Sequence, residues 1–443
     1  MKRGRVMEQE YTPCIIIPGI GQSKIELLDE NGSKLKMAWQ LDIDTDSVVR
    51  KLKYPFIRSV ILRSDLGLSK KMASIVSEIV DPIATNDDGT MKNPIRVVDY
   101  PQSIADCTED DRNYIYRMVP MQRLGKIIGE DKLYFFSYNS FGEPYETAAM
   151  LNDFIQKVKK EHNCDKVNLV PVSMGGAVSI AYFDAYGHQN DIKRVMYFVA
   201  ALQGTPVISD LMKLNINPDK AISLIEFLFP RKVSEMLKKI LSLLPRKVSS
   251  EMMLSAMKGL VDTAIIHCPS LWSTVPPTEY EALAEKNLSE EKYAVLRSKT
   301  DRFYKAQKKF PEHMMQLKSE GVDFFAVVGY NLQLLPIAAA DTVSSDSMIN
   351  VESASMGATA APLGQKLDKE PDGDFISPDG TVDASTSLLP DRVWYFRNQQ
   401  HDNTAYNDTA LEIASKVLSD DSFTSVYSDK SLPRYGDAQD NRK

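Results

Sequence analysis

The sequence predicts an α/β protein with a mainly parallel sheet, helices on both faces of that sheet and a helical cap or lid insertion. Three observations lead to this class. Short runs rich in β-branched and aromatic residues recur along the 443 residues, segments with helical periodicity follow several of them, and residues 207–321 contain no convincing strand. The composition, 43% hydrophobic and 26% charged, is that of a globular protein.

The predicted strands share one feature, which is that apolar residues follow one another without polar alternation. This pattern is typical of strands that are buried on both faces, as in parallel sheets. The strands are expected at residues 14–18, 96–100, 133–138, 167–172, 195–200, 324–329 and 393–396.

Three helices are predicted between or after these strands. Residues 145–162 carry apolar side chains at helical spacing, residues 174–186 begin with two glycines, and residues 407–418 close the fold. We therefore expect a core made of residues 13–206 and 322–421, interrupted by an inserted segment at 41–91. Residues 207–321 would form the cap, and residues 422–443 a polar C-terminal tail. Residues 341–378, rich in Ser, Ala, Gly and Asp, are a third insertion.

The cap segment contains an internal duplication, PRKVS, at residues 230–234 and 245–249. Each copy predicts a helix of about 10–12 residues with proline in its first turn. Three interpretations stay open: ordinary packing, a mobile lid over an apolar pocket, or a surface that touches lipid. The apolar faces would consist of Leu224, Phe227, Leu228, Leu237, Ile240, Leu241, Leu244, Met252 and Met253.

Charge and hydropathy exclude several classes of function. A net charge of −7 argues against a nucleic-acid partner, and no apolar run approaches the ~18 residues of a membrane span. The polar start lacks the apolar stretch of a secretory signal, so a cytoplasmic location is expected. The four cysteines are far apart and are expected to be buried thiols, with neither disulfides nor a metal site.

The strongest chemical signal is KVNLVPVSMGG at residues 166–176, a buried strand that leads through Ser173 directly into a helix. This is the context of a nucleophile elbow, in which a serine stands at a tight strand-to-helix turn near the positive end of the helix. The usual G-x-S-x-G pattern keeps Gly175 but has Pro171 at its first position, which a strand end can tolerate. The alternative is a buried serine that caps a helix.

The base is expected to be His401, because it alone among five histidines follows a terminal strand and precedes the closing helix. The alternative is an exposed structural histidine. The acid should lie in the loop after the strand at 324–329. Asp379, in the tight turn SPDGTV, is the predicted acid and Asp383 the reserve, whereas Asp372 and Asp374 are expected to solvate a loop.

An oxyanion hole requires two backbone amides. Met174 follows the nucleophile, and the amide of Ile20 in IIIPGIG, at residues 15–21, can face the same site. A dinucleotide loop is the competing interpretation, but G-x-G-x-x-G would require glycine where Lys24 stands. We therefore expect no cofactor.

Together these motifs resemble the lecithin:cholesterol acyltransferase and lysosomal phospholipase A2 family of α/β hydrolases, from about residue 13 to residue 418. The likeness rests on PGIGQSKIEL, MAWQLDI, VSMGG, GTP, PSLW, VVGY, PDGTV and the late histidine. It implies an α/β-hydrolase fold, a triad of Ser173, Asp379 and His401, an early oxyanion amide at Ile20, and substrate contacts from Trp39 and Trp272.

The sequence departs from the family at the elbow and at residues 138–141. It also lacks the cysteines that would form the disulfide of the family's lid. We expect a serine lipase or acyltransferase that acts on fatty esters without a metal ion, with peripheral contact to a membrane or micelle surface. The alternative is a relaxed scaffold that binds lipid or a partner. The sequence leaves hydrolysis or acyl transfer, the head group and the oligomeric state open.

Overall fold

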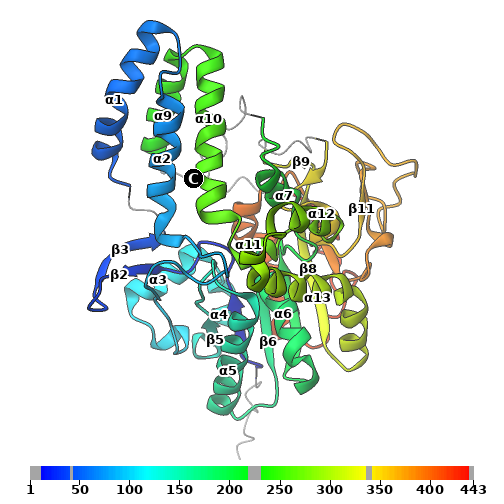
Figure 1. Cartoon of the computed structure of the whole chain (residues 1–443). Coiled ribbons are helices and arrows are strands. Elements are labelled where there is room, and N and C mark those ends of the chain that lie inside the picture. Colours follow the sequence, from blue (N-terminus) through cyan, green and yellow to red (C-terminus); the bar gives the residue numbers. More distant parts are fainter. Residues whose placement is uncertain (1–10, 40–42, 218–230, 336–341, 439–443) are drawn as a thin grey trace, which may run out of the picture.

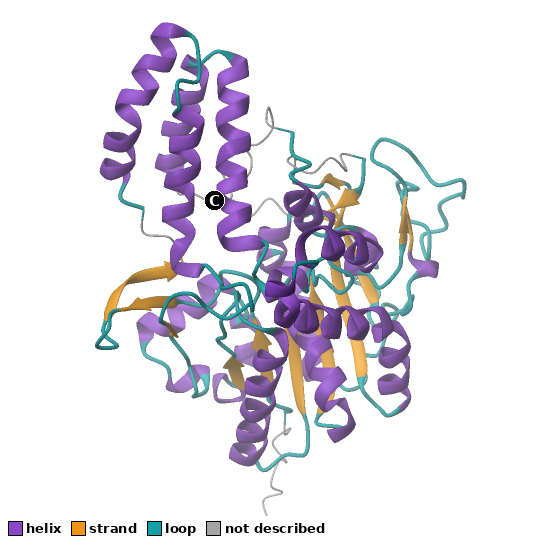
Figure 2. Cartoon of the chain, viewed as in Figure 1, coloured by secondary structure: helices purple, strands orange, loops and turns teal. Residues whose placement is uncertain are grey.

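The computed structural model describes residues 11–39, 43–217, 231–335 and 342–438 (Figure 1). Its centre is a seven-stranded sheet with the order β14-β13-β8-β7-β6-β1-β5, in which all neighbouring strands are parallel (Figure 2). The strands are β1 (Cys14–Ile17), β5 (Leu133–Phe135), β6 (Val167–Pro171), β7 (Ile192–Phe198), β8 (Asp323–Tyr330), β13 (Val393–Arg397) and β14 (Tyr435–Asp437).

Helices cover both faces of this sheet. Successive strand residues point to opposite faces, so each strand contributes to two buried clusters. Ile15 and Ile17 of β1 belong to one buried cluster, whereas Cys14 and Ile16 belong to another. The first cluster is completed by α5 (Pro144–His162), α6 (Gly175–Tyr186) and α13 (Ala294–Ser319). The second is completed by α3 (Glu109–Met118), α4 (Gln122–Ile128) and α15 (Asp408–Ser419). The predicted α/β class is confirmed.

One predicted strand does not join the central sheet. Residues 96–100 contribute only to β4 (Ile95–Val97), which pairs antiparallel with β2 (Ile25–Leu28), and β2 also pairs with β3 (Lys34–Trp39). The prediction of a buried parallel strand there was wrong because β4 is only half-buried and Arg96 reaches across to the Glu26 carboxylate at 2.6 Å. The other six predicted strands lie in the central sheet.

The C-terminal segment also differs from expectation. Residues 422–443 were expected to be a polar tail, yet β14 pairs with β13 at the edge of the sheet. Phe423, Val426 and Leu432 are buried in the same cluster as α15. Apolar residues spaced along a polar segment are sufficient to dock it on the sheet, so the described part of the tail belongs to the core.

Four helices project from the α/β body and form a helical layer that we call the cap (Figure 1). Two come from the first insertion, α1 (Thr45–Leu62) and α2 (Leu68–Val80). Two carry the PRKVS copies, α9 (Arg231–Leu243) and α10 (Arg246–Leu260). Helices α2 and α10 approach closely, since a Cβ atom on Gly259 would lie 2.6 Å from the Ala73 carbonyl oxygen. The cap is therefore built from both insertions.

The remainder of residues 207–321 lies on the α/β body, so the predicted cap boundary was too wide. Phe303 and Phe310 of α13 pack in the core beside α6. Leu224, Phe227 and Leu228 lie outside the described residues, as do the side chains of Leu237 and Ile240, whereas Leu244, Met252 and Met253 are buried and Leu241 is half-buried. The shorter helices here are α7 (Pro206–Lys213), α11 (Pro269–Trp272) and α12 (Pro277–Leu288).

The third insertion and the residues that flank it contribute small elements beside the sheet. They are β9 (Leu332–Gln333), β10 (Ser344–Ser345), α14 (Val351–Ala354), β11 (Thr359–Ala360) and β12 (Val382–Asp383). Among the residues that the structure describes, no helix has the length and apolar character needed to cross a membrane. Cys14, Cys107 and Cys268 are buried free thiols, and the free thiol of Cys164 is half-buried.

Candidate active site

Ser173 occupies a strained turn between β6 and α6. Its φ of +52° lies in the left-handed region, which costs a residue with a side chain roughly 1–2 kcal/mol. Three backbone hydrogen bonds hold it there. The Ser173 amide donates to the Phe198 carbonyl at 3.0 Å, and its carbonyl accepts from the amides of Gly176 and Ala201, each at 3.0 Å. The turn is thus fixed by its surroundings, as expected of a nucleophile elbow.

Two glycines allow this turn to pack against the sheet. A Cβ atom on Gly175 would lie 2.3 Å from the Ile17 carbonyl oxygen, and one on Gly176 would lie 2.8 Å from the Ala200 Cβ atom. Pro171 is the last residue of β6, and the amide that donates to the Ile17 carbonyl is that of Val172, at 2.9 Å. Proline is therefore compatible with the elbow.

His401 lies directly beside Ser173. It follows β13 and opens the short helix η8 (His401–Tyr406). Its Nε2 atom is 2.9 Å from Ser173 Oγ, and its Nδ1 atom is 2.8 Å from Asp346 Oδ2. The histidine side chain is 11% exposed and the aspartate side chain 1% exposed. A serine, an imidazole and a buried carboxylate therefore form one hydrogen-bonded chain.

Asp346 is held in position by the backbone around it. Its Oδ1 atom accepts from the amides of Met348 at 2.9 Å and Ile349 at 2.7 Å, which leaves Oδ2 directed at the imidazole. Its carbonyl also accepts from the His401 amide at 2.8 Å. Gly329 permits this approach, because a Cβ atom there would lie 2.7 Å from the Asp346 Cβ atom. Ring and carboxylate are thus oriented together.

This arrangement changes the basicity of the imidazole. Burial of the ring favours the neutral form, but the negative charge of Asp346 and its hydrogen bond outweigh burial, with a further contribution from the charge of Asp402. The net result is a His401 pKa above its ordinary value of 6.5. A histidine with a raised pKa is a stronger proton acceptor.

The prediction that Asp379 is the acid was wrong, because its carboxylate faces Arg397, while the carboxylate that contacts His401 is that of Asp346. Asp379 Oδ2 lies 2.8 Å from Arg397 Nε, and Oδ1 accepts from the hydroxyls of Ser377 at 2.6 Å and Thr381 at 2.8 Å. These hydrogen bonds and the arginine charge lower its pKa despite burial. The tight turn does hold a carboxylate rigidly, but it directs that carboxylate to Arg397.

The reserve choice, Asp383, is also engaged elsewhere. It forms an ion pair with Lys369, and its Oδ1 atom accepts from the Ser385 amide at 2.9 Å. Asp372 accepts three amides of its own loop, which agrees with its expected structural role. Asp346 was missed, although it is the first aspartate that the structure describes after β8, where the acid of such a site is expected.

The two predicted oxyanion residues, Ile20 and Met174, line the same pocket as Ser173 and His401. The neighbouring Gly19 amide is occupied, because it donates to Gln22 Oε1 at 2.6 Å, and Gln22 Nε2 donates to the Met118 carbonyl at 2.9 Å. A Cβ atom on Gly19 would lie 2.9 Å from Ser173 Cβ. This loop therefore passes immediately beside the serine, with the Gly19 amide already satisfied.

The two tryptophans have different positions. Trp39 lines an apolar cavity, and its ring centroid lies 5.0 Å from that of Phe141. Trp272 is 2% exposed and donates from Nε1 to the Ile266 carbonyl at 2.7 Å. Its ring packs edge-on against Tyr280. The expected substrate contact of Trp272 was wrong, because that residue is part of the packed interior and does not border this cavity or the serine pocket as the structure describes them.

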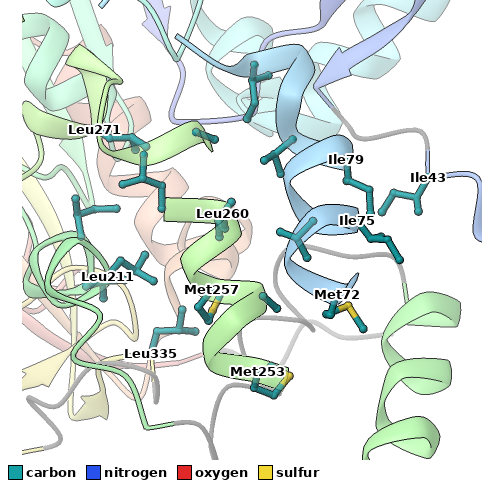
Figure 3. A pocket seen from close by; sticks show the side chains of 18 of the residues that line it. Ile43, Met72, Ile75, Ile79, Leu211, Met253, Met257, Leu260, Leu271 and Leu335 are labelled. Carbon is teal, nitrogen blue, oxygen red and sulfur yellow. The ribbon is translucent and has the colours of Figure 1, made fainter. Parts of the chain in front are cut away.

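The apolar cavity has a volume of about 210 Å³ and lies between α2 and α10. Met72, Ile75 and Ile79 line it from α2 (Figure 3). Met253, Met257 and Leu260 line it from α10 (Figure 3). Every described side chain in its lining is apolar. Four residues, Ile20, Ile208, Leu271 and Met348, border both this cavity and the pocket of Ser173. The serine therefore adjoins a space suited to hydrocarbon.

Among the residues that the structure describes, no group of three His, Cys, Asp or Glu side chains could hold a metal ion. No protein-family model matches the chain, and no curated protein matches it. One similar solved structure is described as "The crystal structure of Tle4-Tli4 complex". It has 12% sequence identity and a TM-score of 0.44, and the alignment covers 93% of this chain and 98% of that chain. Similarity at this level assigns neither a family nor an activity.

Proposed function

We propose that the chain is a serine hydrolase of the α/β-hydrolase fold that cleaves carboxylic esters of long acyl chains. The observation that carries the proposal is the hydrogen-bonded chain from Ser173 through His401 to Asp346 beside a wholly apolar cavity. The parallel sheet, the strained serine and the order Ser, Asp, His along the sequence support the same assignment. The likeness to the acyltransferase and phospholipase family remains a prediction. The acid that it implied, Asp379, is not the carboxylate that contacts His401.

In the first half of the reaction, Ser173 Oγ attacks the ester carbonyl carbon while His401 Nε2 takes the hydroxyl proton. The carbonyl oxygen becomes an oxyanion, and the amides of Ile20 and Met174 are the proposed donors to it. When the carbon–oxygen bond breaks, His401 returns the proton to the leaving alkoxide. An alcohol departs, and the acyl group stays on Ser173.

In the second half, His401 takes a proton from water, and the oxygen of that water attacks the acyl carbon. Ser173 leaves with the proton from His401, and a fatty acid is released. An alcohol in place of water gives acyl transfer by the same steps. Asp346 keeps Nδ1–H directed toward itself throughout and stabilises the imidazolium that forms in each half.

The apolar cavity is the proposed site of the acyl chain. A buried methylene contributes about 0.8 kcal/mol, or roughly fourfold in affinity, provided that the cavity has room for it. The cap helices α2 and α10 form the walls of this cavity, so we assign them the role of a lid. The cavity thus defines the acyl chain of the proposed substrate. The described residues of the site do not define its head group.

The test is hydrolysis of nitrophenyl esters whose acyl chains increase in length. We expect kcat/KM to rise with chain length by roughly fourfold per methylene at first, and Ser173→Ala to abolish turnover at every length. Ester cleavage that survives in Ser173→Ala would overturn the proposal. No cleavage by the wild type, together with binding of the fatty acid, would favour the alternative of a lipid-binding module.

A further inference from the structure

We propose that the exposed face of helix α1 is the surface by which this protein docks on an anionic lipid bilayer. The inference deepens the proposed function by naming where the protein meets aggregated substrate, and its test is a binding measurement that needs no catalysis. The face comprises Val49, Arg50, Lys53, Tyr54, Ile57, Arg58, Ile61 and Leu62.

Large apolar side chains of α1 stand in solvent. Tyr54 is 80% exposed, Ile61 70%, Leu62 60% and Ile57 45%. Tyr54, Ile57 and Ile61 are spaced three and four residues apart, so they form one ridge along the helix. A contiguous apolar ridge on a helix surface indicates a contact with a partner or a membrane, whereas a single exposed apolar residue does not.

The ridge is not the face by which α1 packs against the rest of the protein, because α1 buries its opposite side. Leu52 and Ser59 are buried, and Phe56 and Val60 are half-buried against the cluster of α2. Lys51 also binds the Glu78 carboxylate of α2 at 2.6 Å. Figure 1 shows α1 at the outer edge of the cap, away from the α/β body. Its free face is therefore directed outward.

The charge of this face selects its occupant. Helix α1 has four basic residues and one acidic residue, Asp46 in its first turn, in a chain whose net charge is −7. Arg50, Lys53 and Arg58 are exposed, and within the described residues no carboxylate pairs with them. Apolar ridges flanked by arginine and lysine bind the interface of anionic bilayers, where burial and charge attraction act together.

Two alternative surfaces fit less well. On the PRKVS helices, Arg231 pairs with Glu235 at 3.0 Å and Lys247 with Glu251 at 3.9 Å, and among the described side chains of α9 and α10 only Leu243 and Leu254 are large, apolar and exposed. A second copy of the chain, docked face to face, would place two basic surfaces against one another. The predicted lipid contact therefore moves from the PRKVS helices to α1.

The position of α1 also suits access to the site. Val48 of α1 lines the apolar cavity together with residues of α2 and α10. Docking through the outer face of α1 brings lipid to the cap whose inner side forms the proposed acyl cavity. The surface and the cavity are thus opposite sides of one helical layer.

The experiment uses full-length Ser173→Ala protein, so that no substrate is consumed, in sedimentation with two kinds of vesicle. One is phosphatidylcholine alone and the other contains about one third phosphatidylglycerol. We expect binding to the anionic vesicles to exceed binding to the neutral ones by at least about tenfold and to fall with added salt. Equal binding to both kinds, or to neither, would overturn the proposal.

Two variants locate the surface. Ile57→Glu with Ile61→Glu removes the ridge, and Arg50→Glu with Arg58→Glu reverses the charge. Each should lower binding to anionic vesicles at least about tenfold. The matched control, Arg231→Glu with Lys247→Glu, makes the same charge change on α9 and α10 and should retain binding.

Each pair is also made in the active protein. Unchanged hydrolysis of a soluble short-chain ester then shows that the fold of each variant is intact. A wild type that does not hydrolyse esters would contradict the proposed function but not the proposed lipid surface. Loss of binding in the control pair, or a change of oligomeric state in the ridge variant without any vesicle binding, would contradict the proposal.

Discussion

At the residue scale, the proposed chemistry depends on one buried carboxylate that is fully engaged. Asp346 accepts two backbone amides at one oxygen and the His401 ring at the other. Asp379, in contrast, is neutralised by Arg397. The two aspartates are thus a natural pair of test and control.

We predict that Asp346→Asn lowers kcat on a short-chain ester by about 10⁴-fold, because an amide cannot hold the required imidazole tautomer. Asp379→Asn should leave kcat within about threefold, since this residue only loses an ion pair to a half-exposed arginine. Steady-state kinetics of both purified variants decide the question. The opposite ranking would return the role of the acid to Asp379.

The raised pKa of His401 predicts a pH dependence. His401 must be neutral to accept the serine proton, so kcat/KM should fall as the pH decreases through the raised pKa, with a midpoint above 6.5. In Asp346→Asn, only the smaller contribution of the Asp402 charge would oppose burial, and the midpoint of the residual activity should move below that of the wild type. A profile of kcat/KM against pH, measured for both proteins, would contradict this account if the midpoints coincide.

The nucleophile and the base could be predicted from the residues next to them in the sequence, whereas the acid could not. Ser173 and His401 could be assigned because a strand-to-helix turn and a terminal strand leave recognisable patterns in adjacent residues. Asp346 is oriented by amides two and three residues away, but its contact with the histidine spans 55 residues of chain. Nothing in the residues around Asp379 reveals that Arg397 lies opposite.

At the element scale, the close approach of α6 to β1 depends on Gly175. We predict that Gly175→Ala destabilises the protein by about 1–3 kcal/mol, because its Cβ atom would meet the Ile17 carbonyl at 2.3 Å, and backbone must move to make room. Chemical denaturation should show this loss together with reduced ester cleavage. Gly364→Ala, at a glycine with open space around it but positive φ, provides a comparison in which only backbone strain contributes.

The cavity between α2 and α10 allows a test of chain-length preference. Met257→Trp should fill part of the space and reduce kcat/KM for long-chain esters by roughly tenfold or more, with little effect on short chains. Leu254→Trp places the same side chain at a 39% exposed position of the same helix and should have no such effect. Equal losses at all chain lengths for Met257→Trp would contradict the assignment of this cavity to the acyl chain.

The elements with strong periodicity agree with expectation, whereas short polar strands were missed. Helix α5 is marked by apolar residues at helical spacing, and strand β6 by a mainly apolar run. The burial of strand β3 does not alternate, since its first three residues are all exposed, and β14 carries a glycine between a tyrosine and an aspartate. Such strands are stabilised by their neighbours and carry little local signal.

At the scale of the whole molecule, two insertions that lie far apart in the chain form one cap. Neither α2 nor α10 could be paired from sequence, since each shows only that it has an apolar face. Their packing encloses the apolar cavity beside the serine. Strands β6 and β13 of the central sheet lead to Ser173 and His401, the segment after β10 supplies Asp346, and the cap supplies the surroundings for the substrate.

The C-terminal strand gives a test at this scale. Removal of residues 435–443 should destabilise the fold measurably, because β14 pairs with β13, the strand that leads to His401. Thermal unfolding of the truncated protein, compared with the full chain, checks this. An unchanged unfolding temperature with unchanged activity would mean that β14 is dispensable for the core.

The proposed mechanism requires Ser173 to be an activated nucleophile, and labelling with a fluorophosphonate tests this requirement. This reagent forms a covalent bond to a serine whose proton is removed by a neighbouring base. Intact-mass and peptide analysis should show one adduct, located at Ser173, in the wild type and none in Ser173→Ala, with much slower labelling in His401→Ala. An unlabelled wild type, or an adduct on another residue, would contradict the account.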